Sequence, residues 1–159
     1  MLSVASRSTT DDSLLARYQY LVAEREAPQH PLAVEALATL LAQGNDLFIT
    51  AQNVIEFWSV ASRPTGANGL GWSVETVRQE IERLQAQVPL LDDTADLFTH
   101  WLQLVSTQRV VGRRVHDARL VAAMLVHGIT HLLTFNRDDF RHFAMITVIT
   151  PPELLAAPQ

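Results

Sequence analysis

The sequence predicts a single α/β domain, a sandwich of helices around a mostly parallel sheet. Short apolar segments rich in β-branched residues alternate along the chain with longer segments of helical spacing, which is the pattern of a parallel sheet covered by helices. The chain has 159 residues, the usual size of one domain, and 48% of them are hydrophobic, which is enough for a buried core. With only 18% charged residues, the composition excludes a disordered chain.

Local signals mark the boundaries of the elements in the first half of the domain. Pro31 is tolerated in a first helical turn, Gly44 is a helix stop, and Pro64 ends a helix before it. Three glycines after Pro64 indicate a loop. The expected elements are a helix over residues 32–41, a strand over 46–50, a helix over 52–62 and a loop over 65–71.

The second half shows the same alternation. Ser73 is the expected N-cap of a helix, Gly128 ends the most apolar helix, and Pro151 closes the last strand. The expected helices are residues 76–87, 94–106, 117–127 and 138–143, and the expected strands are residues 88–91, 129–135 and 146–149.

Both ends of the chain differ from this regular part. Residues 1–28 begin with a stretch rich in Ser and Thr and continue without a clean apolar face, so we expect an irregular N-terminal segment there. Regular patterning starts after Pro28. The expected domain is therefore residues 29–151, followed by a tail at residues 152–159.

The composition excludes several classes of chemistry. No cysteine is present, which rules out disulfides, thiol catalysis and Cys-ligated zinc. The net charge of -5 means that the chain as a whole does not attract the negatively charged backbone of nucleic acid. We find no glycine-rich phosphate loop, no Gly-x-Ser-x-Gly elbow and no zinc-binding His spacing among the 6 histidines. Without a signal peptide or an apolar run of about 20 residues, we expect a cytoplasmic protein with no membrane contact.

Two acidic residues stand among apolar neighbours. Glu56 lies between Ile55 and Phe57, and either an exposed helix position or a functional site accounts for it equally well. Asp117 lies at the start of the most apolar helix. It is either an N-cap or a ligand-binding residue, because helix starts at the carboxyl edge of a parallel sheet are where ligands bind.

A third polar group follows the strand that ends at Phe135. It consists of Asn136, Asp138 and Asp139. One interpretation is a capping arrangement, with Asn136 as N-cap and Asp139 three residues later. The other is a site, because each of these acidic positions adjoins a predicted strand end. Clustered oxygen ligands without cysteine suit Mg²⁺ or Mn²⁺, and such a metal supports nuclease-like or phosphatase-like chemistry.

Three segments together resemble the PIN-domain proteins of the VapC toxin type. They are residues 48–64 (FITAQNVIEFWSVASRP), 115–124 (VHDARLVAAM) and 132–140 (LLTFNRDDF), in the order and with the spacing of that family. The resemblance covers roughly residues 29–151. It implies a three-layer sandwich with a mostly parallel sheet between helices.

The resemblance also implies a function. It is that of a metal-dependent endoribonuclease, the toxin of a type II toxin-antitoxin system, which cuts RNA phosphodiesters with metal-activated water. Such toxins are held by a cognate antitoxin and are often homodimers. Matched to the family's motifs, Glu56, Asp117 and Asn136 would hold the Mg²⁺ or Mn²⁺, Asp139 would assist, and Thr134 would help to position the metal or phosphate.

Two arginines extend the implied site toward RNA. Arg113 and Arg114 lie just before the helix that carries Asp117, in a basic segment at residues 108–114. They are candidates for phosphate contacts. A solvated loop explains this segment equally well. The loop at residues 65–71 is another place where target specificity could reside.

The chain departs from the family at its beginning. The family opens with a strand of the form Leu-Leu-Asp-Thr-Asn, whose Asp is a metal ligand, and neither Asp11 nor Asp12 matches it. Residues 15–25 can be encoded so that reading one nucleotide later gives Leu-Leu-Asp-Thr-Asn. We therefore hypothesise that residues 1–28 are translated out of frame.

The missing strand leaves alternatives open. If residues 1–28 are genuine, the chain is a catalytically inactive PIN-like domain that binds RNA or protein, or an unrelated α/β protein whose acids are caps. If residues 1–28 cannot supply the first strand of the family's sheet, that sheet is expected to keep two unpaired inner edges, which favour aggregation and a loose fold.

Overall fold

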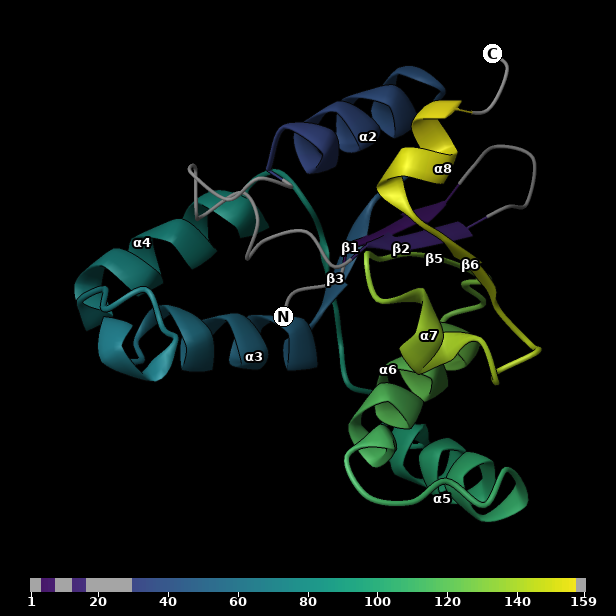
Figure 1. Cartoon of the computed structure of the whole chain (residues 1–159). Helices are drawn as coiled ribbons and strands as arrows, with labels where there is room; N and C mark the ends of the chain where they lie inside the picture. Colours follow the sequence, from purple (N-terminus) through teal and green to yellow (C-terminus); the bar gives the residue numbers. More distant parts are fainter. Residues whose placement is uncertain (1–3, 8–12, 17–29, 157–159) are drawn as a thin grey trace.

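The computed structural model describes residues 4–7, 13–16 and 30–156. A six-stranded sheet lies between helices on both faces (Figure 1). The strands run across the sheet in the order β4-β3-β1-β2-β5-β6. Their bounds are β1 Val4–Arg7, β2 Ser13–Ala16, β3 Phe48–Thr50, β4 Leu90–Leu91, β5 His131–Leu133 and β6 Thr147–Ile149.

The pairing of the strands gives the sheet one dominant direction. β3 pairs with β4, β2 with β5, and β5 with β6, all in parallel. β1 is antiparallel to both of its neighbours, β2 and β3. All strands except β1 therefore run the same way, which confirms the expected α/β fold with a mostly parallel sheet.

The centre of the sheet corrects one expectation. The two inner edges that were expected to stay unpaired are filled by β1 and β2. In β2, Leu15 lies opposite Leu132 and Ala16 opposite Leu133. On the other side, Val4 of β1 lies opposite Ile49. The expected irregular segment at residues 1–28 thus contains two strands, and its remaining residues lie outside the described part of the chain.

Neighbouring residues of a strand point to opposite faces of the sheet, and two hydrophobic clusters result. In β5, Leu132 belongs to the cluster with α6, whereas Leu133 belongs to the cluster with α2 and α3. In β3, Ile49 and Phe48 divide in the same way. β3 and β5 therefore pack against a hydrophobic cluster on both faces of the sheet, as the apolar character of these strands indicates.

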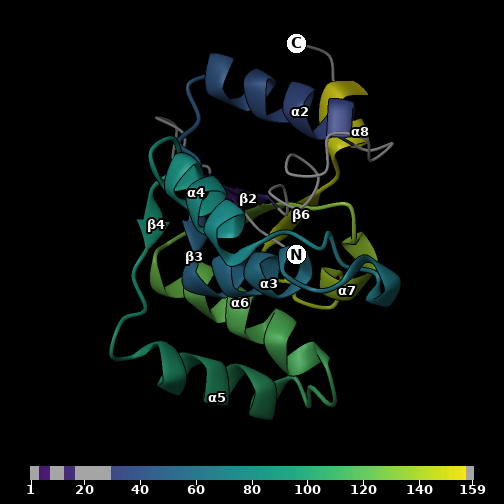
Figure 2. The same cartoon turned by 90° about the vertical axis from the view of Figure 1, so that its left-hand side faces the viewer.

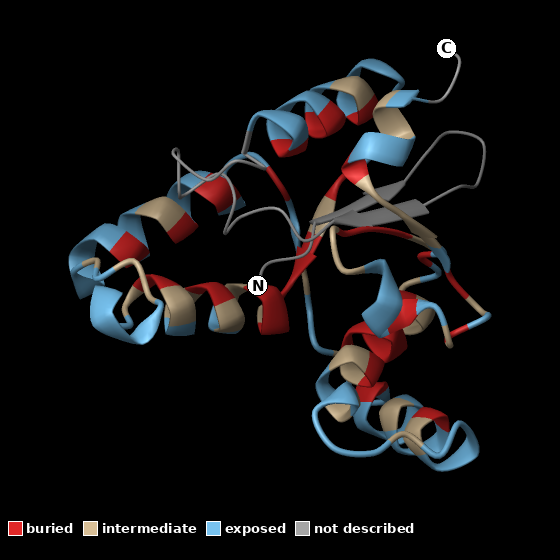
Figure 3. Cartoon of the chain, in the orientation of Figure 1, coloured by how far each residue is buried: buried red, intermediate tan, exposed pale blue. Residues whose placement is uncertain are grey.

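The helices form the outer layers of the sandwich. In both views, α2 and α8 lie on one side of the sheet, and α6, with α5 outside it, lies on the other (Figures 1 and 2). The buried residues of the helices lie mainly on their inward faces (Figure 3). The helices are α2 His30–Ala42, α3 Ala51–Ala61, α4 Val74–Gln85, α5 Leu97–Thr107, α6 Arg114–Val126, α7 Arg137–Phe140 and α8 Pro151–Ala156, with a 3₁₀ turn at Thr65–Ala67.

The structure corrects two boundaries. The tail expected after residue 151 contains α8, whose Leu154 and Leu155 pack against the hydrophobic cluster of α2. The central helix begins at Arg114 rather than at residue 117, so Asp117 lies inside the first turn and is not the N-cap. The expected N-cap Ser73 is confirmed, because its hydroxyl accepts a hydrogen bond from the Thr76 backbone N–H at 3.1 Å. No helix among the described residues is long and apolar enough to cross a membrane.

A buried cap fixes the passage from β3 to α3. Thr50 and Asn53 are each 1% exposed. The Asn53 side-chain oxygen accepts hydrogen bonds from the Thr50 backbone N–H at 3.0 Å and from the Thr50 hydroxyl at 2.7 Å. The Asn53 backbone N–H in turn donates to the Thr50 hydroxyl oxygen at 3.4 Å. This reciprocal capping box sets the direction in which α3 leaves the sheet.

Replacing Asn53 should therefore destabilise the domain. Asn53→Ala leaves two buried donors of Thr50 without their acceptor, which should lower the free energy of unfolding by about 1–3 kcal/mol. Urea denaturation followed by circular dichroism measures this loss. Ser59→Ala, at an exposed position of the same helix, is the control. Equal unfolding midpoints for the two variants would show that the cap contributes nothing.

Candidate functional site

One cleft gathers most of the polar residues that the sequence singles out. It has a volume of about 1160 Å³. Its described lining includes the three expected metal ligands, the assisting Asp139 and both candidate arginines: Glu56, Asp117, Asn136, Asp139, Arg113 and Arg114. Asp138, in contrast, is exposed and does not line the cleft.

The direction of the strands explains this convergence. α3, which carries Glu56, begins directly after β3, and Asn136 follows shortly after β5. These two strands run the same way, so both residues leave the sheet at its carboxyl edge. α6 leads back to the start of β5, which brings its N-terminal turn and Asp117 to that same edge. Ligand sites of open α/β sheets lie at this edge.

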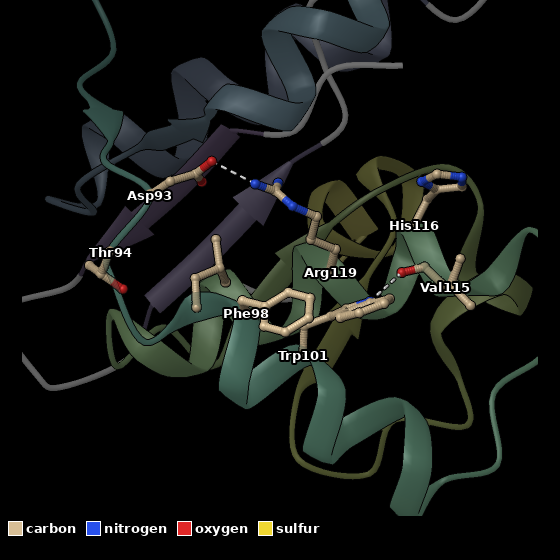
Figure 4. Close-up of a pocket in the computed structure, with 8 residues that line it drawn as sticks. Asp93, Thr94, Phe98, Trp101, Val115, His116 and Arg119 are labelled. Atoms are coloured by element: carbon tan, nitrogen blue, oxygen red, sulfur yellow. Dashed lines mark hydrogen bonds and ion pairs between the residues drawn. The ribbon is translucent and has the colours of Figure 1, made fainter.

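The beginning of α6 is held by α5. The indole N–H of Trp101 donates a hydrogen bond to the backbone oxygen of Val115 at 2.9 Å (Figure 4). Asp117 lies in this first turn, where the helix dipole favours a negative charge. α6 therefore stabilises Asp117 as a carboxylate facing the cleft.

Asn136 lies in the segment after β5, and its side chain does not cap the helix that follows. Asn136 precedes α7, but its side chain makes no capping hydrogen bond, so the capping arrangement with Asp139 is not formed. Its backbone N–H donates to the Thr134 hydroxyl at 3.1 Å. Thr134 is completely buried. Its hydroxyl therefore shapes the turn before Asn136, while the expected role of Thr134 in positioning the metal or phosphate stays a prediction.

Gln52 lies beside Glu56 and was not among the residues that the sequence predicted for the site. The side-chain nitrogen of Gln52 donates to Oε1 of Glu56 at 2.8 Å and to the backbone oxygen of His116 at 2.9 Å. Its side-chain oxygen accepts a hydrogen bond from Nη1 of Arg119 at 3.4 Å. The spacing of four residues between Gln52 and Glu56 is the one signal in the sequence that could have revealed the first of these contacts.

A second, apolar pocket of about 450 Å³ adjoins the cleft. His116 lines both cavities. Phe98 and Trp101 of α5 form one wall, with ring centroids 5.5 Å apart. On the opposite side, Nη2 of Arg119 lies 2.6 Å from Oδ2 of Asp93 (Figure 4).

The pKa of His142 depends on charged residues that line the cleft. Burial is the main cause that holds the pKa of His142 below its ordinary value, and the nearby charge of Arg114 lowers the pKa further. Asp117 and Asp139 act in the opposite direction. Nothing in the local sequence of His142 indicates that it lies near charged residues of α6.

The described residues of the cleft provide oxygen donors but not a complete set of metal ligands. Three carboxylates and an amide oxygen are the ligand types that Mg²⁺ and Mn²⁺ prefer, so the donor set fits these ions in kind. Within the described residues, however, no three acidic or histidine side chains come together closely enough to hold a metal ion. The described residues thus supply oxygen donors of the kind that a hard divalent cation prefers.

Comparisons with known proteins agree with this architecture. Residues 20–145, more than half of the chain, match the sequence pattern of the PIN domain. The fold is similar to VapBC-1 from nontypeable Haemophilus influenzae, with a TM-score of 0.61 and 16% identity over 87% of this chain and 96% of that chain. It is also similar to VapBC2 from Rickettsia felis bound to a DNA fragment, with a TM-score of 0.60 and 14% identity over 86% and 96%. No curated protein matches the sequence.

The charges around His142 give a direct test of the cleft. Arg114→Gln should raise the pKa of His142 toward its ordinary value, because a repelling positive charge is removed, and Asp139→Asn should lower it further. Proton NMR titration of the imidazole signals measures both changes, with His100 of α5 as internal reference. Identical titration curves in the three proteins would show that the charges of Arg114 and Asp139 do not act on His142.

Proposed function

The chain belongs to the PIN domain family, and we propose that it is a metal-dependent endoribonuclease of the VapC toxin type. The observation that carries the proposal is the gathering of Glu56, Asp117, Asn136 and Asp139 in one cleft at the carboxyl edge of the sheet. The reaction would be hydrolysis of an RNA phosphodiester. Proteins of this family are generally nucleases, which supports the reaction class.

The proposed ligands of the metal are Glu56 and Asp117, with Asn136 beside them, and Asp139 assists. A bound Mg²⁺ or Mn²⁺ would supply an activated water and stabilise the developing charge on the phosphate. Arg113 and Arg114 line the same cleft, where their guanidinium groups can hold phosphate oxygens in two-pronged contacts. The metal on the acids and the guanidinium groups of the arginines would thus hold one phosphodiester between them.

A partner is part of the proposal. The two similar structures are VapBC proteins, which supports a cognate antitoxin as the partner of this chain. We further propose that the protein forms a homodimer and acts on cytoplasmic RNA.

The alternative function is that of an inactive PIN domain which binds RNA or a partner protein. The observation that favours it is the lack, among the described residues, of three acids placed closely enough for a metal ion. Metal binding by the purified chain separates the two functions, because an intact site binds Mn²⁺ and an inactive one binds it poorly.

We propose that the missing acid lies in another reading frame of residues 1–28. β2 ends at Ala16, opposite Leu133 of β5, and runs parallel to it. In the frame that is shifted by one nucleotide, the codon for Asp begins inside codon 17. The given frame encodes Arg17 at this position, and β2 ends at the residue before it. An Asp at this place would follow a central strand at the carboxyl edge, as Asn136 follows β5. The domain would then span residues 29–151 together with the restored first strand.

Asp117 should be essential for metal binding and for any activity. Asp117→Asn removes a charged ligand, so we expect Mn²⁺ affinity and metal-dependent RNA cleavage to fall by at least about 100-fold. Calorimetric titration with Mn²⁺ and cleavage of a labelled RNA measure the two effects. Asp138→Asn, the same change at an exposed neighbouring site, is the control. Equal behaviour of the two variants would exclude Asp117 as a ligand.

The coding DNA tests the reading frame. Sequencing codons 13–28 should reveal Leu-Leu-Asp-Thr-Asn one nucleotide out of frame. A chain repaired to that frame should bind Mn²⁺ at least about 10-fold more tightly, since it regains a carboxylate ligand. If the shifted frame encodes no Asp-Thr-Asn, the frame hypothesis is wrong, and the inactive PIN domain becomes the better proposal.

A further inference from the structure

A chain of four polar side chains connects the apolar pocket with the acidic cleft. Asp93, in the loop after β4, pairs with Arg119 of α6, with 2.6 Å between Oδ2 and Nη2. Arg119 donates to the side-chain oxygen of Gln52 on α3 at 3.4 Å. Gln52 donates to Glu56 at 2.8 Å. The chain crosses from one helix to the other at Gln52.

The hydrogen bonds of Gln52 define the orientation of its amide. Its nitrogen faces two acceptors, the Glu56 carboxylate and the backbone oxygen of His116 at 2.9 Å, and its oxygen faces a guanidinium donor. An amide turned by 180° would set its oxygen against both acceptors and its nitrogen against Arg119. Gln52 is 8% exposed, so water does not compete strongly for these bonds.

This arrangement links the two acids that come from different helices. Gln52 holds one oxygen of Glu56 on α3, and it also binds the backbone of His116, the residue before Asp117 on α6. The positions of the two carboxylates are therefore tied together through one buried amide. We propose that Gln52 is a positioning residue that sets the mutual geometry of Glu56 and Asp117, and that Arg119, anchored by Asp93, orients it.

The inference rests on the proposed function, because it gives Glu56 and Asp117 a metal to hold. Residues that orient metal ligands through hydrogen bonds typically affect metal affinity by about 10–100-fold. The ion pair of Asp93 and Arg119 is partly exposed, with side-chain exposures of 44% and 33%, so its part in the effect should be the smaller one.

Metal titration of the full chain tests the role of Gln52. Gln52→Met keeps the size of the side chain and removes all three hydrogen bonds, so Mn²⁺ affinity measured by calorimetry should fall by about 10–100-fold. Gln79→Met, on an exposed face of α4, should leave it unchanged. Arg119→Lys keeps the positive charge but loses the planar fork, and should weaken Mn²⁺ binding in the same direction by less.

A spectroscopic measurement without metal separates positioning from packing. The side-chain amide signals of Gln52 are those that Gln52→Met removes from the ¹H–¹⁵N spectrum. Glu56→Gln should shift one of these two proton signals strongly, because only one proton faces the carboxylate. Unshifted signals would overturn the hydrogen bond on which the inference rests, even if Gln52→Met weakens metal binding through a packing change.

The outcomes distinguish this inference from the proposed function. If the unsubstituted chain binds Mn²⁺ and Gln52→Met binds it equally well, the positioning role is wrong and the proposed function stands. If the unsubstituted chain binds no Mn²⁺, the proposed function is wrong, and the positioning role is wrong with it.

Discussion

The common direction of the strands is the constraint on which the site depends. β3 and β5 run the same way, so the segments that follow these two strands leave the sheet at one edge. α6 returns to the start of β5 and brings its N-terminal turn to that edge as well. Residues far apart in the sequence, such as Glu56, Asp117 and Asn136, therefore line one cleft. Reversal of any of these elements would carry its acid to the opposite edge.

The centre of the sheet is where this chain differs from the pattern that its sequence resembles. A central strand must pair on both sides, and here two short strands, β1 and β2, fill the space between β3 and β5. This pairing satisfies the backbone, which answers the expected problem of unpaired inner edges. It does not supply the acid of the proposed metal site, because the given sequence has Arg17 after β2, where the frame hypothesis places an aspartate. Fold and ligand set are thus separate questions in this protein.

Sequence reasoning found the elements and the acids but not the contacts between them. Helical spacing and strand composition predicted the regular elements, and Glu56 stood out against its apolar neighbours. α8 was missed because two prolines were read as a strand end, although they lie in the first turn of a helix, where proline is tolerated. Gln52 was missed because its partner His116 lies 64 residues further along the chain. Long-range contacts of this kind leave no local pattern.

The charge of the cleft explains why one missing carboxylate matters. Its described lining carries three acids, Glu56, Asp117 and Asp139, and three arginines, Arg63, Arg113 and Arg114. With its histidine neutral, this lining has no net charge and attracts a divalent cation weakly. A fourth acid would make it negative, so that a cation would be drawn in and the cleft would turn positive once the cation is bound. Only then would the arginines and the metal together attract a phosphate. Under the proposed function, the order of binding, metal before RNA, would thus depend on the acid that the frame hypothesis restores.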